Sequence, residues 1–203
     1  MPATGHPLSL LRAFAAGTFL LAAIVLQAVA AESVSSTSAK AWTFTQQYQF
    51  PQAQQAFARE LKRGATTENR EIRLGAAVAM LNHPALKSKD RRASLEELQL
   101  LWDSRGKSPD HVSLWAGYSL GRWSLNYDSP PDFDQANSWF KRIASAGDSH
   151  YVAQLARLKS AGLWLYAPLQ SNPSPAIRVS EAQALSSQIT DRGLRISYLL
   201  TLI

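Results

Sequence analysis

The sequence predicts an all-α fold, built as an array of antiparallel helix hairpins. Three observations lead to this prediction. Apolar residues recur at helical spacing from about residue 39 nearly to the end of the chain. No alternating strand pattern with hairpin turns interrupts them. One short pattern also occurs twice, 83 residues apart, and repetition at intervals of tens of residues is typical of helical repeat proteins.

The duplicated pattern consists of two phenylalanines that frame an alanine, with a glycine further on. Its copies are Phe50-x-x-Ala53-x-x-x-Phe57 with Gly64, and Phe133-x-x-Ala136-x-x-x-Phe140 with Gly147. Weaker copies precede Gly106 and Gly193, which places the four glycines 42, 41 and 46 residues apart. Each alanine lets two helices approach closely, and the phenylalanine one turn further along fills the space beside it. Each glycine follows a helical run, where a left-handed residue closes the last turn.

The individual helices follow from the apolar spacing and from the residues that flank it. Pro51 lies at a helix start, and Asp110 and Asp148 are placed to cap the next helix. Asp132 and Asp134 also lie at a helix start, where capping explains them better than a catalytic acid pair. The charged stretch 87–92 (KSKDRR) is expected to be a solvated loop between repeats. The predicted helices span 39–47, 51–63, 67–82, 93–104, 109–126, 134–146, 149–165, 178–191 and 194–203.

These helices are expected to pair in chain order, which leaves the last one alone. The expected pairs are 39–47 with 51–63, 67–82 with 93–104, 109–126 with 134–146, and 149–165 with 178–191. An array should end in a helix with a polar outer face, yet the tail of this one is strongly apolar. Its apolar residues are Ile196, Leu199, Leu200, Leu202 and Ile203. Three explanations stay open: a cap on the fourth pair, a docking surface for another protein or a second copy, and a truncated form of a longer chain.

The amino end predicts export. Residues 1–12 hold one arginine and no acid, residues 13–30 are almost wholly apolar, and small residues follow at 28–31, which together indicate a signal peptide over 1–31. An uncleaved membrane anchor over 13–30 is the alternative, because about 17 apolar residues lie at the lower limit for a span. A polar linker is expected at 32–38 and the helical repeat domain at 39–203. The predicted location is therefore periplasmic or secreted.

Composition limits the chemistry. Lys and Arg number 21 against 15 acids, a formal charge of +6, which favours acidic partners by long-range attraction. The chain lacks a dense basic stripe, so nucleic-acid binding is not expected. It has no cysteine, and its four histidines have no metal-site spacing. No phosphate-binding or nucleophile motif occurs either. We therefore expect no metal, no cofactor and no catalysis.

The repeated pattern resembles the second helix of a tetratricopeptide repeat. Leu74-Gly75 and Leu120-Gly121 resemble the Leu-Gly pair in the first helix of that family, and residues 136–158 also look like the related Sel1-like repeat. The resemblance covers roughly 39–203, with two of four units matching well. The period of about 41 to 46 residues is longer than the usual 34. The resemblance implies a right-handed α-α superhelix with a concave binding groove.

The same resemblance points to residues that would line the groove. Counted in the family's register, these are Trp42, Trp115, Tyr118, Arg122 and Asn126. Aromatic residues beside an arginine have the composition of a protein-binding hot spot, and an aromatic ring beside polar groups can equally stack on a sugar. The tryptophans expected in the core instead are Trp102, Trp123 and Trp139.

Three functions are compatible with these patterns. The first is an exported scaffold or assembly factor that binds another envelope protein. The second is a module that binds cell-wall or acidic polysaccharide through the basic charge and the groove aromatics. The third is an accessory helical domain of an envelope enzyme, because helical solenoids resembling this one occur in lytic transglycosylases. Contact with a membrane is expected only through an uncleaved leader.

Overall fold

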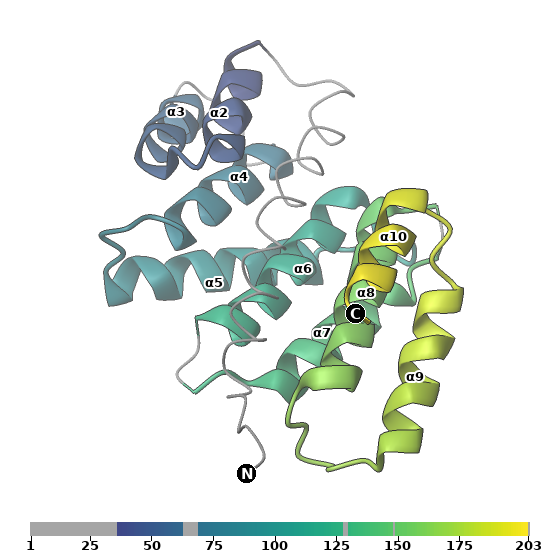
Figure 1. Ribbon diagram of the computed structural model, residues 1–203. Coiled ribbons are helices and arrows are strands. Elements are labelled where there is room, and N and C mark those ends of the chain that lie inside the picture. The colour runs from purple at the N-terminus through teal and green to yellow at the C-terminus, as the bar shows by residue number, and fades with distance from the viewer. Residues whose placement is uncertain (1–35, 63–68, 128–129, 148, 203) are drawn as a thin grey trace. The chain divides into compact units, whose positions relative to one another are not determined.

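The computed structural model describes residues 36–62, 69–127, 130–147 and 149–202 (Figure 1). Over these residues the chain is all-α, with nine helices and no strand, and most consecutive helices pack against each other as hairpins. The chain divides into two compact units, one ending at Glu97 and the other beginning at Leu98. The predicted signal peptide, Gly64 and Asp148 lie outside the described residues, as does the linker up to residue 35.

The first unit is built around Phe57. It contains α2 (Ser36–Gln46), α3 (Phe50–Lys62), α4 (Arg70–Leu81) and the first part of α5 (Ser88–Asp103), and α2, α3 and α4 contact one another. Ala53 and Phe57 are fully buried on α3. The Phe57 ring meets the Trp42 ring of α2 edge to face, with 5.3 Å between centroids. The repeated alanine and phenylalanine therefore form the centre of this unit.

Gly75 lets α4 approach the Phe57 ring. A Cβ atom built at Gly75 would lie 2.3 Å from Cζ of Phe57, much closer than two carbon atoms can pack. No other residue type fits at this point of α4 unless the ring moves. The Leu74-Gly75 pair singled out in the sequence thus has a steric role in the packing of α3 against α4.

We expect Gly75→Ala to destabilise the first unit. Overpacking of this kind costs about 1–3 kcal/mol, although alanine itself favours the helix by about 1 kcal/mol over glycine. Urea unfolding followed by far-UV circular dichroism measures the loss. Gly106→Ala is the matched control, since nothing lies within 4 Å of a Cβ placed there. Adding Phe57→Leu to Gly75→Ala should recover part of the loss, and an unchanged midpoint for Gly75→Ala would contradict the steric role.

The second unit is built around α8. It holds α6 (His111–Asn126), α7 (Phe133–Ala144), α8 (Tyr151–Tyr166), α9 (Pro175–Ser187) and α10 (Arg192–Leu200), and α8 contacts the other four. Every residue from Val152 to Leu163 is buried, because neighbouring helices surround α8. Figure 1 shows α8 lying among α7, α9 and α10. A helix in this position must satisfy its polar side chains within the protein.

Phe140 occupies the interface of α6 and α7. Both Phe140 and Ala136 are fully buried, and the Phe140 ring lies 5.5 Å from the Tyr118 ring between centroids. A Cβ atom built at Gly121 would lie 2.9 Å from the Phe140 ring. Both copies of the motif therefore pack a phenylalanine against a Leu-Gly glycine. The glycine belongs to the following helix in the first unit and to the preceding helix in the second, so the two copies are not equivalent in connectivity.

The three tryptophans assigned to the core are buried. Trp102 and Trp139 meet edge to face at 5.4 Å between ring centroids, and Trp123 stacks on Tyr127 at 4.8 Å. Gly117 of α6 makes room for the Trp102 ring, since a Cβ atom there would lie 2.7 Å from it. The prediction of core packing for these tryptophans is confirmed.

Asp110 and Asp132 cap their helices as predicted, whereas Asp134, in the first turn of α7, accepts from the Gln170 backbone at 3.0 Å. Asp110 accepts a hydrogen bond from the Ser113 backbone at 2.9 Å, and Asp132 accepts one from Gln135 at 2.8 Å. The predicted glycine roles are mostly wrong. Among the described glycines only Gly147 has a left-handed conformation, with φ of +102°. Gly193 does not close a helix but lies in the first turn of α10.

Several helix boundaries differ from the predictions. α5 begins at Ser88, so residues 88–92 form helix and not the predicted loop. α2 begins at Ser36, within the stretch predicted as linker, and α9 begins at Pro175, where Ser174 caps it. The division between the units falls inside α5, so the second predicted pair does not lie in one compact unit.

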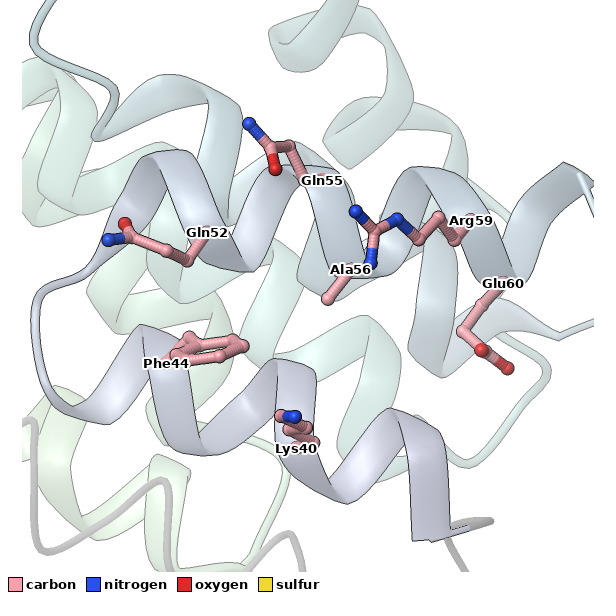
Figure 2. Close-up of a pocket in the computed structure, with 7 residues that line it drawn as sticks. All are labelled: Lys40, Phe44, Gln52, Gln55, Ala56, Arg59 and Glu60. Atoms are coloured by element: carbon pink, nitrogen blue, oxygen red, sulfur yellow. The ribbon is translucent and has the colours of Figure 1, made fainter.

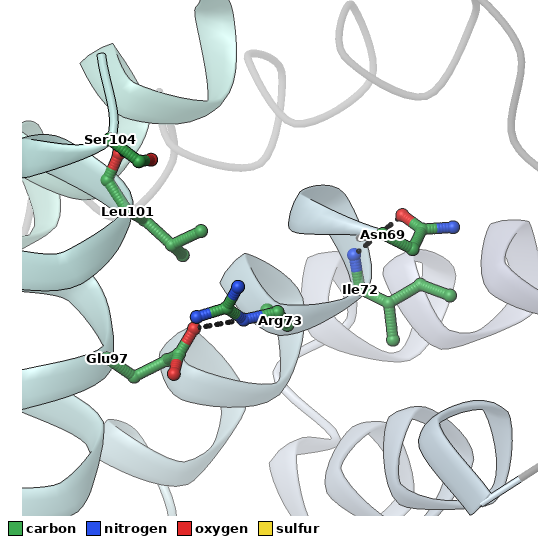
Figure 3. Close-up of polar contacts among 6 residues, drawn as sticks. All are labelled: Asn69, Ile72, Arg73, Glu97, Leu101 and Ser104. Carbon is green, nitrogen blue, oxygen red and sulfur yellow. Dashed lines mark hydrogen bonds and ion pairs between the residues drawn. The ribbon is translucent and has the colours of Figure 1, made fainter. Parts of the chain in front are cut away.

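An ion pair from the middle of α5 links that helix to α4. Nε of Arg73 donates to Oε1 of Glu97 at 2.6 Å, and both side chains are partly exposed (Figure 3). The same view shows Asn69, which caps α4 by accepting from the Ile72 backbone at 3.3 Å. These contacts belong to the first unit. None of the described helices is both long and apolar enough to cross a membrane.

Candidate functional site

Trp42 does not present its ring to a partner. It is 3% exposed and packs against Phe57 in the interior of the first unit. Its predicted position on a groove is therefore corrected to a core position. The other four predicted groove residues all belong to α6, in the second unit.

The four predicted residues on α6 differ in exposure. Tyr118 is 4% exposed, and burial raises its pKa well above the usual range. Its ring meets that of Trp115 edge to face at 5.5 Å between centroids, while Trp115 and Arg122 are partly exposed and Asn126 is exposed. Tyr118 thus supports this surface from inside, and Trp115, Arg122 and Asn126 are the members that a partner can reach.

Two residues of α8, which were not identified from the sequence, lie close to these residues of α6. Lys159 is only 6% exposed, and burial, together with the nearby positive charge of Arg122, lowers its pKa to about 7. Tyr151 is partly exposed, and burial followed by the charge of Asp191 raises its pKa to about 12. A lysine inside an apolar stretch such as LARLKSAGL looks like the polar edge of a helix. Only the packing on all sides of α8 shows that it is buried. We call Trp115, Tyr118, Arg122, Tyr151 and Lys159 the α6–α8 cluster.

The other polar residues of α8 hold neighbouring segments in place. Oε1 of Gln154 accepts from the backbone of Thr190 and of Asp191, at 2.9 and 2.7 Å. Arg157 donates to the carbonyl oxygens of Gln188 and Ala144, at 3.1 and 3.0 Å. Because their polar atoms face backbone groups of the protein, we assign these residues a structural role.

The terminal helix α10 has two different faces. Leu194 and Tyr198 are buried against the rest of the unit, and α10 contacts α8, so one face closes the end of the array as a cap would. The opposite face exposes large aliphatic side chains. These are Ile196, Leu199 and Leu200, which are 48%, 59% and 65% exposed, together with Leu202, which follows the end of the helix and is 50% exposed. We call these four residues the α10 apolar face.

A shallow groove lies between α2 and α3 in the first unit. Its volume is about 260 Å³, and its lining combines an aromatic ring, two amides, two cations and one carboxylate (Figure 2). The residues are Lys40, Phe44, Gln52, Gln55, Ala56, Arg59 and Glu60. Nζ of Lys40 lies 5.9 Å from the centroid of the Phe44 ring, within the range of a cation–π contact.

Neither a metal centre nor similarity to a known protein identifies the function. Among the described residues no group of three or more acidic or histidine side chains could hold a metal ion. His83, in the turn after α4, accepts a hydrogen bond from the Ala85 backbone at 3.1 Å through Nδ1. No protein-family model, curated protein or solved structure matches this chain with significant similarity.

Proposed function

We propose that this chain is an exported, non-catalytic scaffold that binds another envelope protein. The observation that carries the proposal is the α10 apolar face. Clusters of exposed large aliphatic side chains are uncommon on soluble monomers and mark sites of protein contact. The apolar leader at 13–30 and the polar stretch after it support export.

The α6–α8 cluster supports the same role by another route. It combines an accessible tryptophan with an arginine, and these residue types dominate the binding energy of protein interfaces. Arg122 carries a positive charge at neutral pH, which agrees with the basic balance of the whole chain and favours an acidic partner. The second unit therefore offers two surfaces for a protein partner, one apolar and one charged.

The proposal predicts that Leu200→Glu abolishes partner capture. A carboxylate at the centre of an apolar interface must lose its hydration, which lowers affinity by about 2 kcal/mol or more, or at least about thirtyfold. Pull-down from envelope extract with the folded chain as bait, followed by mass spectrometry, measures the recovery of stoichiometric partners.

Leu100→Glu is the matched control, because Leu100 is 58% exposed on α5, apart from the α10 apolar face. Both variants add the same charge at a similarly exposed leucine. A partner retained by Leu100→Glu and lost by Leu200→Glu supports the proposal. Equal recovery with both variants contradicts a role for α10.

Binding of an acidic polysaccharide is the second candidate function. The groove between α2 and α3 favours it, because an aromatic ring, amides and cations line one concave surface. Protein and polysaccharide binding would use different units, so separate variants test them.

A further inference from the structure

We propose that the groove between α2 and α3 binds a pyranose ring that carries a carboxylate, such as one residue of an acidic polysaccharide. The inference deepens the second candidate function and does not depend on protein binding by α10. It rests on three properties of the lining: a flat apolar surface, an excess of positive charge, and two amide side chains placed beside them.

The apolar surface comes from Phe44 and Ala56. Figure 2 shows the Phe44 ring on α2 turned toward α3, with the Ala56 methyl group pointing at it from above. Phe44 is only partly buried, so one side of the ring stays open to the groove. The C–H groups on one face of a pyranose are apolar, and an aromatic ring is the surface on which they pack in water. The ring therefore selects a ligand with a flat, partly apolar face.

The charges favour a monoanion. Lys40 and Arg59 are exposed cations on opposite walls of the groove, on α2 and α3, and Glu60 is the carboxylate among the lining residues. Two cations against one anion leave the groove positive. Arginine offers two parallel N–H donors that match a carboxylate, while Lys40 lies beside the Phe44 ring and can contact the same anion. A neutral sugar can accept hydrogen bonds from these cations but gains no attraction between opposite charges.

The amides suit the hydroxyl groups of a sugar. Gln52 and Gln55 both lie on α3 and are exposed, on the same wall as Arg59. Each amide offers a donor and an acceptor, which pairs with neighbouring hydroxyls that also donate and accept. The volume of about 260 Å³ lies just below the roughly 300–1,000 Å³ of pockets for drug-sized ligands, which fits one sugar ring.

The experiment measures binding of glucuronate, glucose and acetate to the full chain by ligand-observed NMR. An open groove of this size should bind glucuronate with a dissociation constant of about 1 mM, and glucose and acetate about tenfold more weakly, because each lacks one half of the recognition. Arg59→Gln should weaken glucuronate binding about tenfold and leave glucose unchanged. Phe44→Leu should weaken both sugars and leave acetate unchanged.

Arg195→Gln serves as the control, since it removes the same charge from an exposed arginine on α10, in the second unit. Circular dichroism verifies that each variant is folded. If Arg195→Gln lowers the affinity for glucuronate as much as Arg59→Gln does, then the effect comes from the overall charge of the protein, and the proposal is overturned. Acetate binding as tight as glucuronate binding would overturn it as well, as would no detectable binding of glucuronate. None of these outcomes bears on partner capture by α10, which the Leu200→Glu experiment tests separately.

Discussion

Phe140→Ala is expected to lower the free energy of unfolding of the second unit by about 3–5 kcal/mol. The ring has no solvent exposure and lies between Tyr118 and the bare backbone at Gly121. Removing it loses the transfer free energy of the ring and leaves a cavity that these neighbours cannot fill. Gly121 has no side chain to move into the space, and the Tyr118 ring is held by its contact with Trp115. A loss of this size is a large part of the stability of a small unit.

The motif itself provides the comparison for this variant. Phe133 belongs to the same repeated pattern but is only partly buried at the start of α7, so Phe133→Ala should cost clearly less than Phe140→Ala. Phe57→Ala should match Phe140→Ala in size but destabilise the first unit. Urea unfolding followed by tryptophan fluorescence and by circular dichroism measures each loss. Equal losses for Phe133→Ala and Phe140→Ala would contradict the central position of Phe140.

The features that the sequence predicted correctly depend on few residues that are close in the chain. Asp110 and Asp132 cap their helices through atoms three residues away, so the pattern alone is enough. The Phe-x-x-Ala-x-x-x-Phe spacing predicts a buried helix face in both copies for the same reason. The spacing could not predict which glycine contacts each phenylalanine ring, because that depends on which neighbouring helix packs against the ring.

The errors arose where charge or tertiary contact decided the structure. Residues 88–92 are helical although they look like a loop, since charged residues on an exposed helix face need no apolar spacing. Gly193 lies inside α10 because Asp191 caps that helix through the Leu194 backbone at 2.9 Å, ahead of the glycine. Trp42 was placed on a groove, but Phe57 lies against its ring. Lys159 is buried because four helices surround α8. The periodicity of one helix does not reveal how many other helices pack around it.

Lys159→Met is expected to stabilise the protein at neutral pH and to lose this advantage as the pH rises. The pKa of Lys159 is about 7 in the folded protein, against 10.5 for an ordinary lysine, because of burial first and the charge of Arg122 second. Between these two values the unfolded chain binds a proton that the folded chain does not. Stability of the natural protein therefore rises with pH across this window, by about 1.4 kcal/mol per pH unit at most. Methionine has a similar length and carries no charge, so the variant should lack this rise.

Urea unfolding of both proteins from about pH 6 to about pH 9 measures the difference. The free energies of unfolding of the natural and variant proteins should differ most at the acid end, by at most about 5 kcal/mol, and become similar toward the alkaline end. The range stops below the ionisation of Tyr118 and Tyr151, whose pKa values are raised and whose linkage would lower stability above about pH 10. Lys107→Met, at an exposed lysine, is the control and should give a difference that does not change with pH. If Lys159→Met behaves like Lys107→Met, then Lys159 keeps an ordinary pKa, and the α6–α8 cluster holds its two cations in water and not within the packed helices.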